Sequence, residues 1–305
     1  MARYLTTRIF FTLFTFWVIV TLVFFLMRLA PGGPFDGDRR LPPDVEANLL
    51  AAYNLDKPIV EQYVDYLVMI SHGDLGPSFK QKDFSVNELV RAGLPVSLTV
   101  GGLALIIALS SGIALGVRAG LDTGSRIDTV VMGSANLGLA VPSIVLAPVL
   151  LLLFGVWLGW LPAGGVGSPA HYVLPSIALA LPFTAAIARL TRGSVAETRL
   201  EPHVMTAIAK GLPRSRIVLR HILPIALLPV LTYLGPAAAA LLTGSVVIEQ
   251  VFDLPGIGRY FVQAALNRDY TLVMGVVVVY AAFILLFNLF VDLSYKRLDP
   301  RIELR

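Results

Sequence analysis

The chain has 305 residues, of which 56% are hydrophobic and only 14% charged, with a net charge of +4 and a mean hydropathy of +0.76. Soluble domains carry about 25% charged residues, so this composition excludes an ordinary soluble protein and indicates an integral membrane protein. The absence of cysteine excludes disulfides, thiolate metal sites and cysteine nucleophiles. The four histidines are scattered without metal-ligand spacing, so no metal site is expected in this chain.

Apolar segments long enough to cross a bilayer recur along the chain. A membrane-spanning helix needs about 20 mostly apolar residues. We therefore predict an all-α protein with six transmembrane helices, at roughly 9–30, 96–117, 130–154, 172–189, 223–248 and 270–293. Pro142 and Pro236 should interrupt the third and fifth spans, because proline frees a backbone carbonyl and kinks a helix. The first segment has no clear small-residue cleavage site, so we expect it to be a retained span rather than a signal peptide.

These spans divide the chain into three parts. Residues 1–30 form an N-terminal tail and the first helix, 31–94 an external segment, and 95–305 a core that holds helices two to six and an inner loop at 190–222. The external segment is rich in turn formers and has helical patterning at 45–53 and 59–70. It is too small for a catalytic domain. Two interpretations remain open: a lid over the spans, or a docking or gating surface for an external partner.

The basic residues predict the orientation of the chain. With both ends in the cytoplasm, 15 of the 24 Lys and Arg residues lie inside. The short loops follow the same bias, and short loops are where the positive-inside rule is reliable. We therefore expect both termini to face the cytoplasm.

The second span carries a small residue at every fourth position: Ala104, Ala108, Gly112, Gly116 and Gly120. Such a stripe lets another helix backbone approach closely. It indicates packing against another helix of this chain or, as the alternative, against a second membrane subunit.

Sequence signals of catalysis are absent. There is no GxxxxGK[ST] phosphate loop, HExxH or GxSxG motif. The ionisable residues close to the spans, Arg28, Arg118, Glu249 and Asp292, all lie near span ends. A charge at mid-membrane would mark an ion or proton pathway, so this placement argues against a proton-coupled transporter. We expect a non-enzymatic conduit that takes its energy from a soluble motor on the inner side.

The inner loop 190–222 contains a short helix with strong boundary signals. Pro202 suits the first turn, Lys210 suits the last, Gly211 can adopt the left-handed conformation after the end, and Pro213 prevents continuation. A helix of about ten residues is marginal alone in water, so something must hold it. It either lies on the inner surface of this protein or enters a groove on a cytoplasmic partner.

The string TAIAKGLPRSRIVLRHILP resembles the coupling-loop signature of ATP-binding-cassette importer permeases, with Ala207, Gly211, Ile217 and Pro224 at the motif positions. Four further strings, MRLAPGGPF, ARLTRGSVAE, TGSVVIEQVFDLPGIGRYFVQAALNRDY and YKRLDPRI, resemble the peptide/nickel group of these permeases. Within that group the chain is most similar to the B-type membrane subunit of oligopeptide permeases. The resemblance runs from the first span to the C-terminus and implies the fold of a type I importer permease.

The resemblance also implies partners and a site. The chain would pair with a second homologous permease, two ATPase subunits holding ATP and Mg, and an extracytoplasmic peptide-binding protein. The spans would contact membrane lipid, and no nucleic-acid partner is expected. The residues expected to couple to the ATPase are Val204, Met205, Thr206, Ala207, Ile208, Ala209, Lys210, Gly211, Leu212, Pro213 and Ile217. Members of the family often have Arg where this chain has Met205 and Ile208, so this contact should depend more on packing than on charge.

Two further sets of residues are candidates for a role in transport. Polar or helix-breaking residues within spans can line a peptide path or simply bond between helices: they are Asn136, Pro142, Ser143, Thr243, Gly244 and Ser245. Pro255, Gly256 and Gly258 predict a tight external turn, with gating or partner contact as the alternative. Arg189 and Arg192 are expected to be inner-face anchors, with a coupling role as the alternative.

The sequence thus predicts the permease subunit of an ATP-driven oligopeptide importer in a bacterial inner membrane. Dipeptides, nickel chelates or other small solutes are alternative substrates. A self-sufficient channel or secondary transporter is the alternative from a different class, and a scaffold without a transport path is a weaker one. Transport without nucleotide would distinguish the channel or transporter.

Overall fold

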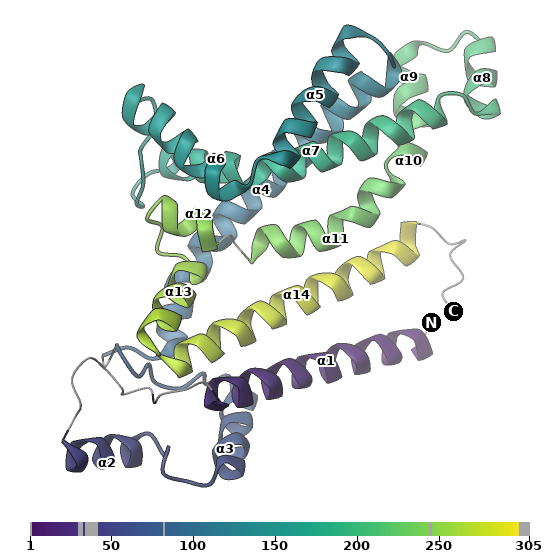
Figure 1. Cartoon of the computed structure of the whole chain (residues 1–305). Coiled ribbons are helices and arrows are strands. Elements are labelled where there is room, and N and C mark those ends of the chain that lie inside the picture. Colours follow the sequence, from purple (N-terminus) through teal and green to yellow (C-terminus); the bar gives the residue numbers. More distant parts are fainter. Residues whose placement is uncertain (1, 30–32, 34–41, 82, 244–245, 299–305) are drawn as a thin grey trace. The chain divides into compact units, whose positions relative to one another are not determined.

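The computed structural model describes residues 2–29, 33, 42–81, 83–243 and 246–298, and all that follows concerns these residues. Every regular element in them is helical, and the one strand-like pairing is an isolated bridge between Pro77 and Ser85. The helices form two compact units (Figure 1). The first comprises Met1–Pro95 and Pro255–Leu289, and the second Val96–Leu254 and Phe290–Arg305. Each unit is described by itself.

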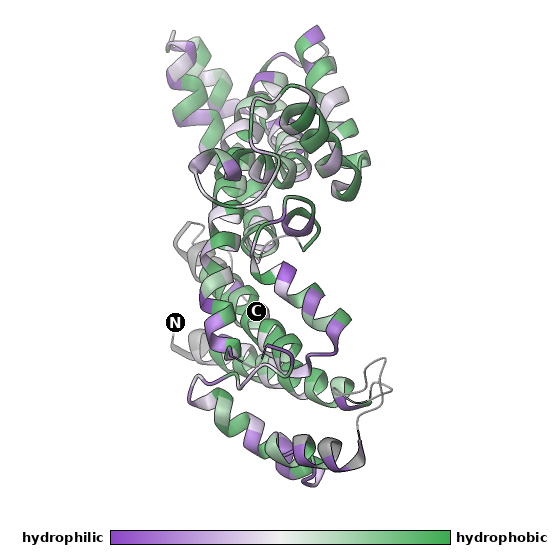
Figure 2. Cartoon of the chain, turned by 90° about the vertical axis from the view of Figure 1, so that its left-hand side faces the viewer, coloured by the Kyte–Doolittle hydropathy of each residue, from purple (hydrophilic) through white to green (hydrophobic). Residues whose placement is uncertain are grey.

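In the described part of the chain, five stretches are long and apolar enough to cross a membrane: Thr6–Leu29, Val86–Leu121, Pro169–Thr198, Leu228–Val251, which includes the undescribed residues 244 and 245, and Tyr270–Phe290. Large apolar side chains on the first of them are exposed, including Phe10 and Leu26, as expected of a surface that meets lipid. In Figure 2 most of the length of the long helices is coloured green, the colour of hydrophobic residues. The prediction of a multi-span, all-α protein is confirmed.

The predicted third span is bent. Helices α5 (Arg126–Ala140) and α6 (Ser143–Leu150), the latter continued by the π-helical turn η1 (Leu151–Trp157), meet at an angle of 106°. Val141 before the proline is extended, with φ −85° and ψ 116°, because a residue preceding proline avoids the helical region. The interruption at Pro142 is confirmed. Counted as one span, this pair raises the total to six, and the six-span count stays a prediction.

The predicted break at Pro236 is wrong. Helix α11 (Leu228–Leu242) continues through this proline. The predicted segment is divided elsewhere, into α10 (Leu223–Ala226), α11 and α12 (Val246–Val251). Helix packing can compensate a carbonyl that proline leaves without a partner, and the backbone need not break there.

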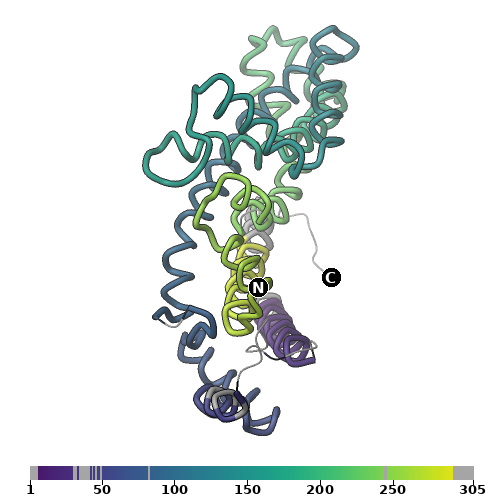
Figure 3. Tube along the Cα trace, turned by 60° about the vertical axis from the view of Figure 1, so that its left-hand side comes forward, coloured from purple at the N-terminus to yellow at the C-terminus, as the bar shows by residue number. Residues whose placement is uncertain are grey.

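The first unit contains α1 (Ala2–Leu29), α2 (Pro43–Ala52), α3 (Ile59–Ser71), the start of α4 (Val86–Leu121), α13 (Ile257–Asn267) and most of α14 (Tyr270–Leu298). Its core joins Phe24, Tyr66, Val86, Ile257 and Val276. The helices predicted at 45–53 and 59–70 are confirmed as α2 and α3. Helices α1 and α14 lie side by side in two views (Figures 1 and 3).

A buried carboxylate organises the start of α14. Asp269 is 1% exposed and accepts hydrogen bonds from the Ser78 hydroxyl and from the backbone N–H groups of Phe79 (3.1 Å), Lys80 (3.3 Å) and Leu272 (3.2 Å). The bond to Leu272 caps the first turn of α14, while the others hold a loop that lies about 190 residues earlier in the chain. Asp269 therefore ties two distant segments together.

The second unit is built around α7 (Val173–Thr198), which follows the 3₁₀ turn η2 (Pro169–Tyr172). Helices α5, α6, α10, α11 and α12 all pack on α7. The core includes Val100, Ala104, Leu174, Ile187 and Phe252. The remaining elements are α8 (Pro202–Ala209), α9 (Arg214–Ile217) and the π-helical turn η3 (Val218–Ile222).

The small-residue stripe of α4 packs on α7 within the same unit. A Cβ at Gly112 would lie 2.8 Å from the Ile187 side chain, and one at Gly116 would lie 2.6 Å from the Ala188 carbonyl oxygen. At Gly120 it would lie 2.7 Å from the Arg192 carbonyl oxygen. For these glycines, packing inside the chain is confirmed.

Gly116→Ala is expected to destabilise the protein by about 1–3 kcal/mol, because the new methyl group has backbone on one side and Thr191 on the other. Thermal unfolding in detergent would measure the loss. Gly133→Ala is the matched control, since nothing lies within 4 Å of a Cβ at that position. Equal unfolding temperatures for the two variants would contradict the close packing of α4 and α7.

Candidate coupling site on the Pro202–Ala209 helix

Local signals set both ends of α8. Glu201 precedes it in an extended conformation and Pro202 occupies the first turn, where its missing N–H costs nothing. At the other end Gly211 adopts φ +69°, its N–H donates to the Ile208 carbonyl at 2.9 Å, and the Leu212 N–H donates to the Ala207 carbonyl at 3.3 Å. This pair of bonds is a Schellman motif, in which glycine takes the left-handed position. The predicted capped helix is confirmed, with eight residues instead of about ten.

One face of α8 packs on the protein itself. Val204 is 1% and Ala207 3% exposed, and they join a cluster with Val195, Ile217 and Ile222. Leu212 packs against the same cluster just after the cap. The His203 ring contributes a polar tie, because its Nε2 lies 3.0 Å from the His221 carbonyl oxygen. The helix is therefore fixed in orientation by burial, as a device that transmits force would require.

The face of α8 next to the buried one is apolar and uncovered. Met205 and Ile208 are 54% and 53% exposed, although both are large hydrophobic residues. They border a cavity of about 450 Å³ whose walls include Leu121, Leu200 and Ile222. Thr206, Ala209, Lys210, Gly211 and Pro213 are also exposed. A contiguous exposed apolar patch on a rigid helix is typical of a surface that binds another protein.

The basic segment after α8 faces outward. Arg214, Arg216 and Arg220 are exposed. Arg214 makes two long contacts with Asp122, at 3.3 and 3.5 Å, and the exposure of this pair makes it weak. The Arg214–Ile222 stretch runs into the apolar helices α10 and α11. Exposed arginines at the end of a span suit the anionic headgroups of membrane lipids.

Two arginines, Arg192 in α7 and Arg199 just after it, tie α7 to the segment between α4 and α5. Arg192 forms a bidentate pair with Asp128, with Nε to Oδ1 at 3.0 Å and Nη2 to Oδ2 at 2.8 Å. Arg199 donates to the Leu121 carbonyl and to the Thr123 hydroxyl, both at 2.7 Å. The loop between α4 and α5 is thus tied to α7. Arg192 was expected to be an anchor, but the sequence did not reveal its partner: Asp128 lies 64 residues away.

The residues predicted to line a transport path are not brought together at any cavity described here. Asn136 and Pro142 are exposed, Ser143 opens α6, and the Thr243 hydroxyl donates to its own helix at the Ala239 carbonyl (2.9 Å). Such a back-bonded hydroxyl is a common way for a polar side chain to sit in an apolar helix. Gly244 and Ser245 lie outside the described residues. A path role for this set stays a prediction.

The tight turn predicted at Pro255–Gly258 lies a few residues earlier in the chain. The tight turn lies at Phe252–Asp253, where Asp253 has φ +52° and the Leu254 N–H donates to the Glu249 carbonyl at 2.9 Å. Gly256 is extended and precedes α13, and Gly258 lies in the first turn of that helix. Both glycines are buried, so their role in the described structure is close packing rather than a turn.

Glu249 is buried, which the sequence did not indicate. It lies near the end of a span as expected, but its side chain is fully buried and accepts a hydrogen bond from the Ser97 hydroxyl at 2.6 Å. A buried carboxylate needs such partners because desolvation of the charge is costly. The pair connects α12 to the second-unit part of α4.

Comparison with known proteins agrees with this architecture. Residues 112–304 match the family model described as "Binding-protein-dependent transport system inner membrane component". The chain is 48% identical to the oligopeptide transport system permease protein OppB of Salmonella typhimurium over 95% of both chains. It is 44% identical to the dipeptide transport system permease protein DppB of Bacillus subtilis over 100% of this chain and 99% of that one.

Solved structures show the fold at lower identity. An inward-facing structure of the MetNI methionine ABC transporter has a TM-score of 0.57 at 17% identity, covering 69% of this chain and 96% of that one. A structure of an amino acid ABC transporter with histidines has a TM-score of 0.54 at 20% identity, covering 69% and 94%. The described helices therefore have the fold of an ABC importer permease. The chain belongs to the family of binding-protein-dependent transport system inner membrane components.

Proposed function

We propose that this chain is a permease subunit of an ATP-binding-cassette importer that moves oligopeptides inward across a bacterial cytoplasmic membrane. The observation that carries the proposal is α8: a short helix that begins at Pro202 and ends in a glycine cap, with one face buried on the permease and an exposed apolar face formed by Met205 and Ile208. The substrate class is supported by the relatives, which are named as oligopeptide and dipeptide permeases.

In this proposal the chain holds no catalytic group. ATP and Mg bind in two separate ATPase subunits, a second homologous permease completes the membrane part, and an extracytoplasmic binding protein delivers the peptide. The coupling surface comprises Val204 to Pro213 together with Ile217. Its buried members, Val204, Ala207 and Ile217, fix the helix, while its exposed members enter the ATPase groove. Both termini then lie in the cytoplasm, and residues 31–94 lie outside.

Dipeptide import is a second candidate. It is favoured by the 44% identity to a dipeptide permease, which spans the whole chain. Uptake of labelled dipeptides and longer peptides by the same vesicles would rank the two substrates.

The test begins with gentle purification of the chain from its native membranes. Mass spectrometry of the co-purified subunits should find a second permease and ATPase subunits. Reconstituted vesicles, with the binding protein added on the outer side, should take up labelled peptide only when ATP is supplied on the cytoplasmic side. A chain that purifies alone and moves solute without nucleotide would contradict the proposal. That result would favour a self-sufficient channel or secondary transporter.

A further inference from the structure

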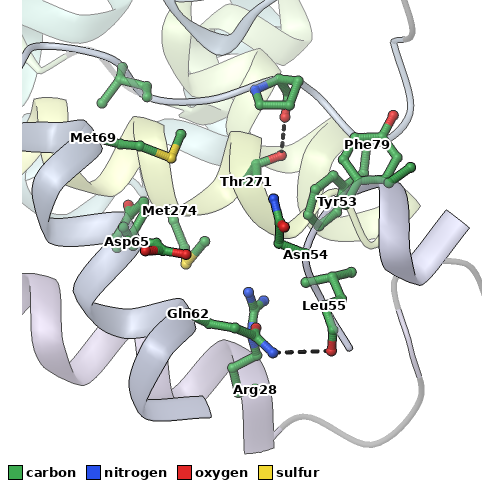
Figure 4. Close-up of a pocket in the computed structure, with 14 residues that line it drawn as sticks. Arg28, Tyr53, Asn54, Leu55, Gln62, Asp65, Met69, Phe79, Thr271 and Met274 are labelled. Carbon is green, nitrogen blue, oxygen red and sulfur yellow. Dashed lines mark hydrogen bonds between the residues drawn. The ribbon is translucent and has the colours of Figure 1, made fainter. Parts of the chain in front are cut away.

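A second cavity, of about 220 Å³, lies within the first unit (Figure 4). Its walls come from the end of α1, the loop after α2, one face of α3, the segment 75–79 and the first turns of α14. The permease function above assigns no role to this cavity. In the proposed orientation it opens on the outer side of the membrane.

The cavity contains an arginine, Arg28, that forms no ion pair among the described residues. The Arg28 Nε donates to the Gln62 Oε1 at 3.0 Å, and its guanidinium lies 5.0 Å from the centre of the Phe24 ring. Its Nη1 is buried and has no hydrogen-bond partner, and in the described part of the chain no carboxylate forms an ion pair with it. Arginine cannot lose its proton in a protein, so this charge persists. A buried donor of this kind is costly unless a ligand satisfies it.

Gln62 holds the arginine in place. Its Nε2 donates to the carbonyl oxygens of Leu55 (3.1 Å) and Lys57 (2.8 Å), which leaves its Oε1 to accept from Arg28. Figure 4 shows Arg28 pointing from α1 toward Gln62 and Asn54. The Arg28 guanidinium is therefore held in place before any ligand binds, and its unpartnered Nη1 has a fixed position.

A second unpartnered donor lines the same cavity. Tyr66 on α3 is 6% exposed, and its hydroxyl has no partner. Burial raises the pKa of Tyr66 well above its ordinary value, and the nearby Arg28 charge opposes this less strongly. The phenol therefore stays protonated. The Arg28 Nη1 and the Tyr66 hydroxyl are therefore two donors without acceptors. The two oxygens of a carboxylate could accept one hydrogen bond from each.

The other residues that line the cavity limit the size and charge of a ligand that could bind there. Met69, Leu75 and Met274 give it an apolar wall, and its volume is below the roughly 300–1,000 Å³ of pockets that enclose a whole small-molecule ligand. Asp65 also lines it, with its carboxylate 2.8 Å from the Lys57 ammonium. The Asp65 carboxylate would repel a doubly charged phosphate more strongly than a singly charged terminal carboxylate. One terminal residue of a peptide fits these features better.

We propose that this cavity binds the C-terminal residue of a peptide, with Arg28 and Tyr66 donating to the terminal carboxylate and Met69, Leu75 and Met274 packing on the last side chain. The assignment rests on the proposed peptide import and adds to it a site on the permease that distinguishes a free carboxyl end. It would hold a peptide at the outer face before the peptide enters the membrane.

The test is calorimetric titration of the protein, purified with the subunits that accompany it but without binding protein. The probes are trialanine, its C-terminal amide and inorganic phosphate. We expect trialanine to bind at least about tenfold more tightly than the amide, since hydrogen bonds to a charged group are the stronger kind. Arg28→Gln and Tyr66→Phe should each remove most of that preference. Tyr63→Phe is the matched control on α3, because the Tyr63 hydroxyl already bonds to Thr21 at 2.6 Å and Tyr63 does not line the cavity.

Equal binding of acid and amide would overturn the inference, and so would an unchanged preference in Tyr66→Phe. If Arg28→Gln fails to fold, the acid-over-amide preference of Tyr66→Phe alone tests the inference. Phosphate that competes as tightly as trialanine would show a general anion site and overturn the peptide assignment. ATP-dependent trialanine uptake by wild-type vesicles is measured in parallel. Uptake without an acid preference contradicts this inference alone, whereas no uptake of any peptide contradicts the proposed function.

Discussion

The double variant Met205→Glu/Ile208→Glu is expected to abolish ATP-driven peptide uptake while leaving the permease folded. Both side chains are more than half exposed, so the carboxylates remain in water in the isolated chain and little stability is lost. In the assembled transporter the same carboxylates would be buried without a partner against the ATPase, which costs several kcal/mol. At 1.4 kcal/mol per tenfold change, that is a loss of two orders of magnitude or more in subunit affinity.

The measurement combines two readouts on the same preparation: the amount of ATPase that co-purifies with the permease, and labelled-peptide uptake by vesicles. Val60→Glu is the control, because Val60 is 65% exposed on α3, in the other unit. It places the same charge on an equally apolar surface residue and should leave both readouts near wild type. Normal recovery of ATPase with the double variant would place the coupling contact elsewhere.

Val204→Glu should behave differently although Val204 is next to Met205. Val204 is 1% exposed in the cluster that holds α8, so a charge there must break the packing. The permease itself should then lose thermal stability. The contrast between neighbouring positions separates loss of docking from loss of fold.

Asp269→Ala is expected to give the largest loss of stability in the first unit, about 3–5 kcal/mol. The substitution leaves the Ser78 hydroxyl and the backbone N–H groups of Phe79 and Leu272 without their acceptor, and these donors are buried. Each unmet buried donor costs about 1–3 kcal/mol. The segment around Ser78 should detach from α14 and become sensitive to protease.

Thermal unfolding in detergent and limited proteolysis would measure these effects. Asp74→Ala is the control, because the exposed Asp74 accepts only the Gly76 N–H, at 2.9 Å, and its loss should cost less than 1 kcal/mol. An unfolding midpoint for Asp269→Ala no lower than that of Asp74→Ala would show that the buried carboxylate does not hold the two segments together.

Local features of the structure could be predicted from the sequence because their causes lie within a few residues of each other. The apolar runs are long enough to cross a bilayer, and they correspond to the long helices. Pro142 breaks a helix through the residue beside it. Gly211 ends α8 through its own left-handed conformation, which lets its N–H bond to a carbonyl three residues earlier and the Leu212 N–H bond to one five residues earlier. The small-residue stripe of α4 predicted a close helix contact, although not which helix would make it.

Other features depended on which distant segments meet, and no spacing in the sequence encodes that. Asp269 and Ser78 are 191 residues apart, and Glu249 and Ser97 are 152 apart. Pro236 has the same chemistry as Pro142, but α11 continues through it in its packed surroundings. Arg192 was expected to be an inner-face anchor, but only the fold showed that it pairs with Asp128, at 2.8 Å. The sequence by itself determined where the long apolar helices run and how α8 ends, because those signals lie within a few neighbouring residues. Only the tertiary structure decided which polar groups are buried and paired, because burial depends on every segment that packs around them.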